Sequence, residues 1–175
     1  MAVTLYRISI PVFQRMLGNL QACLDKGEVE AAARQADPAT LLTARLAPDM
    51  FTLTQQVQLA SDFAKGAGAR LANVENPKFA DSEKSFAELR DRIARTQAFL
   101  KGLTPAQVNG GEDREITLSI AQQPTTMAAT EFLTHYAFPH FFFHVTTAYD
   151  ILRAQGVALG KPDFMGSFAG VGRVQ

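Results

Sequence analysis

Apolar residues recur every three or four positions along most of this chain, which is the spacing of one face of an α-helix. Proline and glycine divide the 175 residues into four long segments with this pattern, at about 4–26, 48–71, 82–102 and 126–155. In the first segment the recurring residues are Leu5, Ile8, Val12, Met16 and Leu20. Hydrophobic residues make up 47% of the sequence, enough for one buried core. The sequence therefore predicts one all-α domain, residues 1–175, folded as a four-helix bundle with long crossover connections.

Three residues are expected to interrupt or end these helices. Gly27 is expected to end the first helix after Lys26. Pro11 should kink that helix or mark where its regular part begins, because its ring clashes with the carbonyl four residues earlier. Pro139 should kink or break the last helix for the same reason.

The connections between the helices carry their own signals. The second helix is expected to begin near Pro48 or Asp49 and the third after Asp81–Ser82, since these residue types suit a first turn or a cap. Apolar and polar residues alternate from Glu115 to Ile120, which predicts a short strand or hairpin arm before the last helix. Residues 28–47 read as a connector, and residues 157–175, with four glycines, as an extended C-terminal tail.

Charge and cysteine content exclude several classes of protein. Lys+Arg and Asp+Glu are equal at 17 each, so no net positive field attracts nucleic acid. The most apolar stretch, Phe132 to Tyr149, contains three histidines and a proline and does not suit a membrane span. Cys23 is the single cysteine, so no intramolecular disulfide can form, and the first residues lack the pattern expected of a signal peptide. We therefore expect a cytoplasmic protein.

The candidate site is built on histidine. All three histidines fall within ten residues, and His140 and His144 stand four apart, on one face of a helix. This spacing suits ligands of a divalent metal such as Zn²⁺ or Ni²⁺, but a catalytic zinc usually takes three protein ligands. His135 precedes His140 by five residues, about 140° around a continuous helix, and is expected to point elsewhere unless Pro139 breaks the helix.

The third ligand would have to come from the second helix. Gln56 is the chief candidate, with Asp49 and Thr52 seven and four residues before it, although an amide is a weak ligand for transition metals. Tyr149 and Asp49 could complete the lining of a pocket that holds a small molecule. The alternative is that the histidines are core residues hydrogen-bonded to neighbours such as Tyr149 or Thr147.

Several motifs resemble the bacterial domain of unknown function 1993. The resemblance covers nearly the whole chain and rests on Leu46–Phe51, Gln56–Gln58, Pro139–Arg153, Gly156–Val157 and Gly160–Gly166. That family is identified as a member of the DinB/YfiT-like superfamily of four-helix bundles. Many members of the superfamily are dimeric and described as metalloenzymes, some of them thiol-dependent transferases. The resemblance implies a metal site of one histidine on the second helix and two, four apart, on the fourth.

This chain matches that pattern only in part. His140 and His144 correspond to the paired histidines, whereas Gln56 or a neighbour stands where the resemblance implies the third. The first hypothesis is therefore a DinB-like bundle that binds a small molecule or acts as a divalent-metal-dependent enzyme with an incomplete three-histidine site. The second is a non-catalytic homodimeric structural or interaction protein that has lost the metal, with its aromatic helix serving subunit contact. The aromatic residues in question are Phe138, Phe141, Phe142 and Phe143.

Overall fold

The computed structural model describes residues 3–167, which are mostly helical with one small antiparallel hairpin. The long helices are α1 (Leu5–Ala33), α3 (Leu53–Ala72), α4 (Phe86–Gly102) and α7 (Phe138–Ala154). Short helices α6 (Ala129–Glu131) and the π-helix η1 (Phe132–Ala137) lead directly into α7. The remaining elements are α2 (Pro38–Thr43), α5 (Pro105–Val108), α8 (Lys161–Met165), β1 (Glu115–Ile120) and β2 (Gln123–Ala128).

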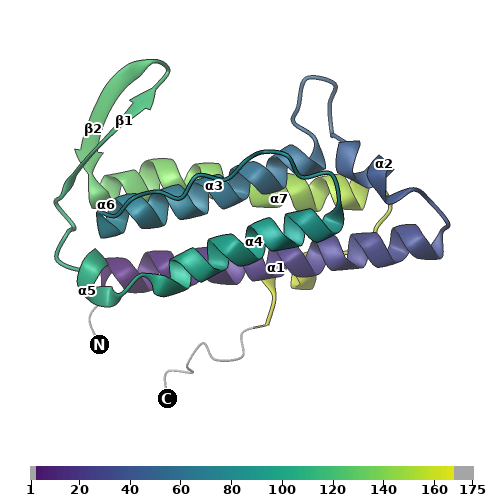
Figure 1. Ribbon diagram of the computed structural model, residues 1–175, viewed down its shortest axis with the longest axis horizontal. Coiled ribbons are helices and arrows are strands. Elements are labelled where there is room, and N and C mark those ends of the chain that lie inside the picture. Colours follow the sequence, from purple (N-terminus) through teal and green to yellow (C-terminus); the bar gives the residue numbers. More distant parts are fainter. Residues whose placement is uncertain (1–2, 168–175) are drawn as a thin grey trace.

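The long helices lie side by side (Figure 1), with α3 against both α4 and α7 and α1 against the same two. Helices α3 and α4 run in the same direction, so residues 73–85 return along the length of the helices to join them. Leucine and alanine side chains make up most of the core between the helices, and Phe13, Phe86, Phe132 and Phe141 are also fully buried. A predominantly helical fold with a long return connection is thus confirmed.

Side-chain caps set where α3 and α4 begin, and they correct two predicted starts. The Thr52 hydroxyl accepts a hydrogen bond from the Gln55 amide, and the Gln55 side chain bonds back to Thr52, so α3 begins at Leu53 and not at Pro48 or Asp49. Ser85 caps α4 in the same way, four residues after the predicted Asp81. Residues 44–52 therefore form a loop that stands away from the helices (Figure 1).

Helix α1 is longer than predicted because Gly27 does not end it. The helix passes through both Pro11 and Gly27 and ends at Ala33. A Cβ atom at Gly27 would lie 2.9 Å from Leu152 Cδ2, so a larger residue here would force that side chain of α7 to move. The same holds at Gly68, where a Cβ would lie 2.7 Å from Leu100 Cδ2 of α4.

The predicted strand at Glu115–Ile120 is confirmed, and the hairpin that was one of the two expectations is present. Its second strand takes residues whose C-terminal part was expected to begin the last helix. Strands β1 and β2 are antiparallel, with Glu115 opposite Ala128 and Ile120 opposite Gln123. Ala121 and Gln122 both have positive φ, as a two-residue hairpin turn requires. The last helical segment therefore starts at Ala129 and not at Thr126, and the hairpin projects beyond the helices (Figure 1).

The chain after α7 folds back onto α1. It contains the short helix α8, where the sequence predicted an extended tail, and residues 168–175 of that tail lie outside the described residues. Lys26 Nζ lies 2.6 Å from Asp163 Oδ1, and Asn19 donates a hydrogen bond to the Phe164 carbonyl at 2.9 Å. None of the helices within residues 3–167 has the length and apolar character needed to cross a membrane.

One buried ion-pair cluster joins α3, α4 and the returning segment 73–85. The fully buried Arg92 guanidinium lies within 3.0 Å of three carboxylates, those of Asp62, Asp81 and Glu83. Burial alone would raise the pKa of Glu83, but hydrogen bonds from Gln58 and Arg92 outweigh it and hold that pKa below its usual value. The cluster thus compensates most of the desolvation of its own charges.

Candidate small-molecule pocket lined by histidines

A π-helical turn brings all three histidines to one cavity. The Phe138 amide donates to the Leu133 carbonyl five residues earlier, so the helix widens by one residue just before Pro139. This widening turns His135 toward the side that carries His140 and His144, and all three line the same cavity. The sequence analysis placed His135 elsewhere on a continuous α-helix, and the π-turn at Pro139 is the physical reason for the difference.

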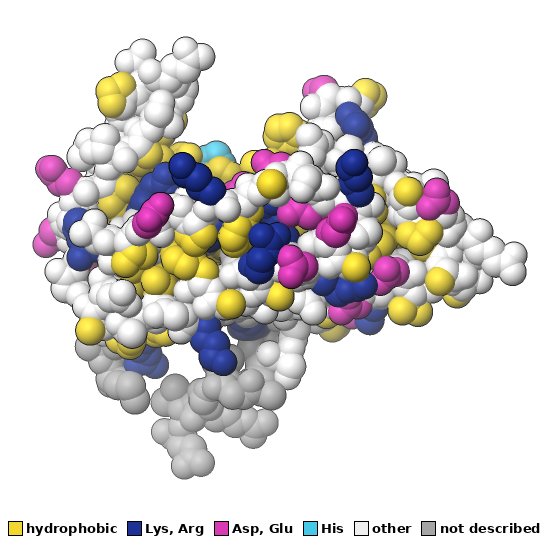
Figure 2. Space-filling model, viewed as in Figure 1, with side chains coloured by type: hydrophobic (Ala, Val, Ile, Leu, Met, Phe, Trp, Pro, Cys, Tyr) yellow, Lys and Arg dark blue, Asp and Glu magenta, His cyan; other side chains and the backbone are white. Residues whose placement is uncertain are grey.

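The cavity has a volume of about 610 Å³ and walls that are mostly apolar. It lies in the hollow between the hairpin and the loop of residues 44–52, where a histidine is visible in Figure 2. Helix α3 contributes Leu59 and Phe63, and the loop contributes Phe51. Its other lining residues are His135, Pro139, His140, Phe143 and His144.

His144 is held by a buried hydrogen bond across the α3–α7 interface. Its Nδ1 atom lies 2.7 Å from Gln56 Oε1, and the two residues are only 6% and 1% exposed. The Gln56 Nε2 atom donates to the Phe51 carbonyl at 3.4 Å, which orients the amide oxygen toward the histidine. Because an amide oxygen can only accept, His144 carries its proton on Nδ1. Its Nε2 atom, with no hydrogen bond to the described residues, is left as an acceptor.

His144 is neutral at physiological pH. Burial removes water from the ring, and the neighbouring His140 adds to the effect, so the pKa of His144 is lowered to about 4. No carboxylate faces the ring within the described part of the chain to stabilise an imidazolium. The exposed edge of His144 is therefore a neutral hydrogen-bond acceptor in apolar surroundings.

Aromatic rings surround the histidine pair. Phe63 stacks on His140 at a centroid distance of 4.4 Å and an interplanar angle of 6°, and it lies 5.4 Å from the ring of His144. Tyr136 packs against His140 from another side at 4.5 Å, and Phe143 meets His144 edge-on at 5.3 Å. Such walls suit a flat apolar or aromatic ligand.

Two other predicted site residues lie outside this cavity. Asp49 is exposed in the turn of the 44–52 loop and is not among the lining residues. Tyr149 packs its ring against Phe164 of α8 at 5.6 Å, and its hydroxyl lies 3.4 Å from Arg153. Thr52, the other oxygen donor considered, is occupied as the cap of α3. Of the residues singled out from sequence, the structure brings His135, His140 and His144 to one cavity and joins Gln56 to His144.

Comparison with known proteins shows the family of the chain. The sequence profile of a domain of unknown function, DUF1993, matches residues 5–165. This chain belongs to the DUF1993 family. The crystal structure of a DinB family member from Shewanella denitrificans superposes on it with a TM-score of 0.87 and 41% sequence identity, over 94% of this chain and 93% of that one. No curated protein matches the DUF1993 chain.

The side chains at this site of the DUF1993 protein differ from the three-histidine metal site that the superfamily resemblance implies. Within residues 3–167 no group of three or more His, Cys, Asp or Glu side chains is arranged to hold an ion. Gln56, which stands where the third histidine is implied, directs its oxygen at His144 Nδ1. Two imidazoles and an occupied amide do not fit a tightly held three-ligand metal.

Sequence reasoning missed the aromatic part of this site. Gln56, Leu59 and Phe63 follow a spacing of three and four, so they share one face of α3, and that signal could have placed Phe63 beside the histidines. Phe51 could not be found in this way because it lies in a loop. The π-turn that places His135 and Tyr136 leaves no periodic signal in the sequence.

Proposed function

We propose that this DUF1993 protein is a DinB-like four-helix bundle that binds a small molecule in the histidine cavity. The ligand has a flat apolar body and carries an O–H or N–H group that donates to His144 Nε2. The observation that supports this most directly is the Gln56–His144 hydrogen bond at 2.7 Å, which fixes the tautomer and leaves an acceptor in an aromatic cavity. A donor aimed at this acceptor replaces a water hydrogen bond and sets the ligand's orientation.

The electrostatics of His144 favour binding over general-base catalysis. A general base that works near neutral pH needs a pKa near that pH. A carboxylate hydrogen-bonded to the histidine commonly stabilises the protonated ring. Here the partner is the uncharged Gln56, and the pKa of His144 is about 4. Such an imidazole can accept a hydrogen bond, but it is too weak a base to take up a proton near neutral pH.

Two phenyl derivatives of similar size test the proposal. 4-Ethylphenol carries the donor group, and 4-methylanisole lacks it. Calorimetry should show that the protein binds 4-ethylphenol about tenfold more tightly, the size of one hydrogen bond to a buried acceptor. His144→Phe should abolish this preference, whereas His135→Gln, an exposed change at the cavity rim, should retain it. Equal affinity for the two compounds, or no binding of either, would contradict the proposal.

A divalent metal at His140 and His144 is a second proposal, favoured by their spacing of one helical turn on the cavity wall. With two protein ligands the wild-type protein should bind Zn²⁺ or Ni²⁺ weakly. Gln56→His supplies a third imidazole and should tighten Zn²⁺ binding about a hundredfold, as judged by calorimetry. His144→Ala should remove the wild-type signal. Tight stoichiometric binding by the wild type would show that our assessment of the donor set is wrong.

The alternative function, a homodimeric interaction protein, is favoured by the exposure of two phenylalanines at the cavity rim. Phe51 and Phe143 are 52% and 56% exposed, and large apolar side chains gathered in this way are typical of surfaces that a ligand or another chain covers. Light scattering of the wild type and of Phe143→Glu distinguishes the two. A dimer that Phe143→Glu separates into monomers would support the interaction protein, and unchanged mass would favour the small-molecule pocket.

A further inference from the structure

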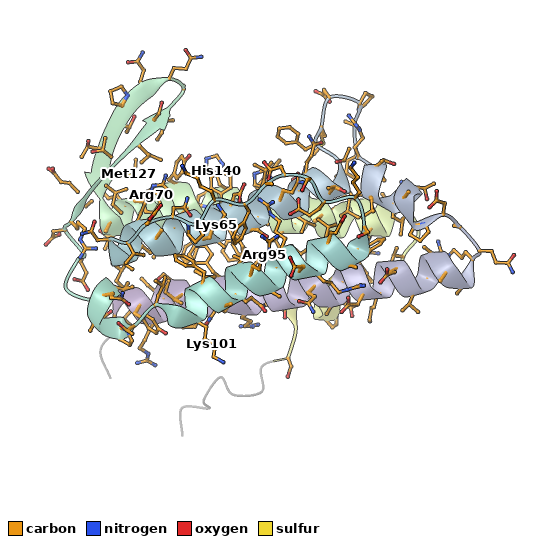
Figure 3. The ribbon with its side chains drawn as sticks, in the orientation of Figure 1. Lys65, Arg70, Arg95, Lys101, Met127 and His140 are labelled. Carbon is orange, nitrogen blue, oxygen red and sulfur yellow. The ribbon has the colours of Figure 1, made fainter. Side chains whose placement is uncertain are left out.

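A second, polar groove adjoins the histidine cavity across the ring of Phe63. The groove has a volume of about 290 Å³ and shares Leu59 and Phe63 with the cavity. Tyr136, which also lines the groove, lies 4.5 Å from the His140 ring. Figure 3 shows Lys65, Arg70 and His140 on the same face of the molecule. The cavity and the groove therefore share a wall formed by Leu59 and Phe63, with the Tyr136 ring beside it.

Two cationic side chains of α3 line this groove and keep free donors. Lys65 is buried, and its Nζ atom lies 3.0 Å from Asp62 Oδ1, its one carboxylate partner among the described residues. An ammonium has three donors, so two remain. Arg70 donates to the Gly66 carbonyl at 3.0 Å and has no carboxylate within 4.0 Å in the described part of the chain. Its planar guanidinium can bind a carboxylate through two parallel hydrogen bonds.

The floor of the groove is built from Gly66 and Asn76. A Cβ at Gly66 would lie 2.9 Å from Arg70 Nη1 and 3.6 Å from Asn76 Nδ2, so glycine lets both polar groups settle close to the helix backbone. Glycine inside a helix is otherwise unfavourable. The Asn76 Oδ1 atom is buried and has no hydrogen-bond partner within residues 3–167, although buried acceptors are normally paired. These residues thus leave a polar site that a ligand would complete.

The charge of the groove limits the ligand further. Lys65 and Arg70 carry two positive charges and Asp62 one negative charge, and all three line the groove. Asp62 also pairs with Arg92, whose Nη2 atom lies 2.7 Å from Asp62 Oδ1. The groove thus carries one net positive charge, and the forked guanidinium of Arg70 suits the two oxygens of a carboxylate. Both features match a carboxylate better than a doubly charged phosphate.

We infer that the ligand of the histidine cavity is a carboxylic acid whose carboxylate lies in the groove between Lys65 and Arg70. This inference rests on the proposed function, because the apolar body of the acid occupies the histidine cavity. A donor group next to the carboxylate would satisfy Asn76 Oδ1. The protein is thereby selective for amphipathic acids over neutral compounds of the same shape.

A series of (4-hydroxyphenyl)alkanoates with one to four methylene groups tests the inference, with the corresponding primary amides as neutral controls. Calorimetry should show that at least one acid binds about tenfold or more tightly than its amide, as charge-assisted hydrogen bonds predict. Arg70→Gln should remove this ratio. Lys101→Gln removes one charge on α4, on another edge of the molecule in Figure 3, and should leave the ratio unchanged.

Gly66→Ala provides a variant that separates binding from folding. Alanine favours the helix, so the melting temperature should stay the same or rise, while the added Cβ displaces Arg70 and the ratio of acid to amide affinity falls. Acids and amides that bind equally well to the wild type would overturn the carboxylate inference and leave the cavity proposal standing. Failure of 4-ethylphenol, the amides and the acids alike would overturn the cavity proposal itself.

Discussion

Arg92 and His144 are both buried polar side chains that face α3, but they are partnered in opposite ways. Arg92, on the α4 side, reaches three carboxylates within 3.0 Å, and of its three nitrogens only Nε lacks a partner in the described part of the chain. His144, on the α7 side, makes one hydrogen bond to an uncharged amide and keeps a free nitrogen at a cavity. The first arrangement compensates charge and holds elements together, whereas the second leaves an acceptor for a ligand.

The largest expected effect is on the Arg92 side. Arg92→Met leaves the Glu83 and Asp62 carboxylates without their buried counter-charge and should lower the free energy of unfolding by about 3–5 kcal/mol in urea titrations. Lys26→Met is the control, because Lys26 is half exposed and pairs with Asp163 at the surface, where an ion pair contributes much less to stability. Similar losses for the two variants would mean that the buried cluster does not stabilise the fold in this way.

The next effect is pH-dependent and belongs to His144. The pKa of its imidazole is about 4 in the folded protein and about 6.5 in the unfolded chain, so the unfolded state binds the extra proton between these values. Stability should therefore be full above pH 6.5 and fall by about 2–3 kcal/mol as the pH drops to 4. His144→Gln should lose less stability over this range in urea titrations at each pH. Parallel profiles for wild type and variant would contradict the lowered pKa.

Gln56 and Gln58 offer a matched pair of amides on the two sides of α3. Gln56→Leu leaves the buried His144 N–H without an acceptor and should destabilise the protein by about 1–3 kcal/mol. Gln58→Leu removes one hydrogen bond from Glu83, which keeps Arg92, so its loss should be smaller, about 1 kcal/mol. Chemical denaturation of both variants measures the difference. A larger loss for Gln58→Leu than for Gln56→Leu would contradict the claim that His144 depends on a single partner.

The smallest effect on stability is expected at the cavity rim. Phe143 is more than half exposed, so Phe143→Ala should change the free energy of unfolding by less than about 0.5 kcal/mol. The same variant should weaken 4-ethylphenol binding about threefold to tenfold, because one aromatic contact is lost. A stability loss above 2 kcal/mol would place Phe143 in the structural core and not at a binding surface.

The sequence predicted the helices well because their apolar periodicity extends over many residues. It failed where a single contact decides the outcome. Gly27 was expected to end a helix, but it lies inside α1. Its missing side chain leaves room for Leu152, a residue far away in the sequence. The start of α3 was predicted too early because Pro48 also suits the first turn of a helix. The capping box formed by Thr52 and Gln55 sets the actual start.

The site was predictable to the extent that helical spacing defines it. His140 and His144 share a face and line one cavity, and Gln56, predicted as a third ligand, forms a hydrogen bond with His144. Three features were beyond this reasoning. The π-turn that redirects His135, the loop that brings Phe51, and the groove around Lys65 and Arg70 all depend on tertiary contacts.

The protonation state of His144 at pH 7 tests the central claim most directly. Nitrogen-15 NMR of histidine-labelled protein, with His144→Gln to assign the signal, reports which ring nitrogen carries the proton. We predict a neutral ring with the proton on Nδ1 and an unprotonated Nε2 that does not titrate above about pH 5. A proton on Nε2, or a titration midpoint near 6.5, would contradict the account.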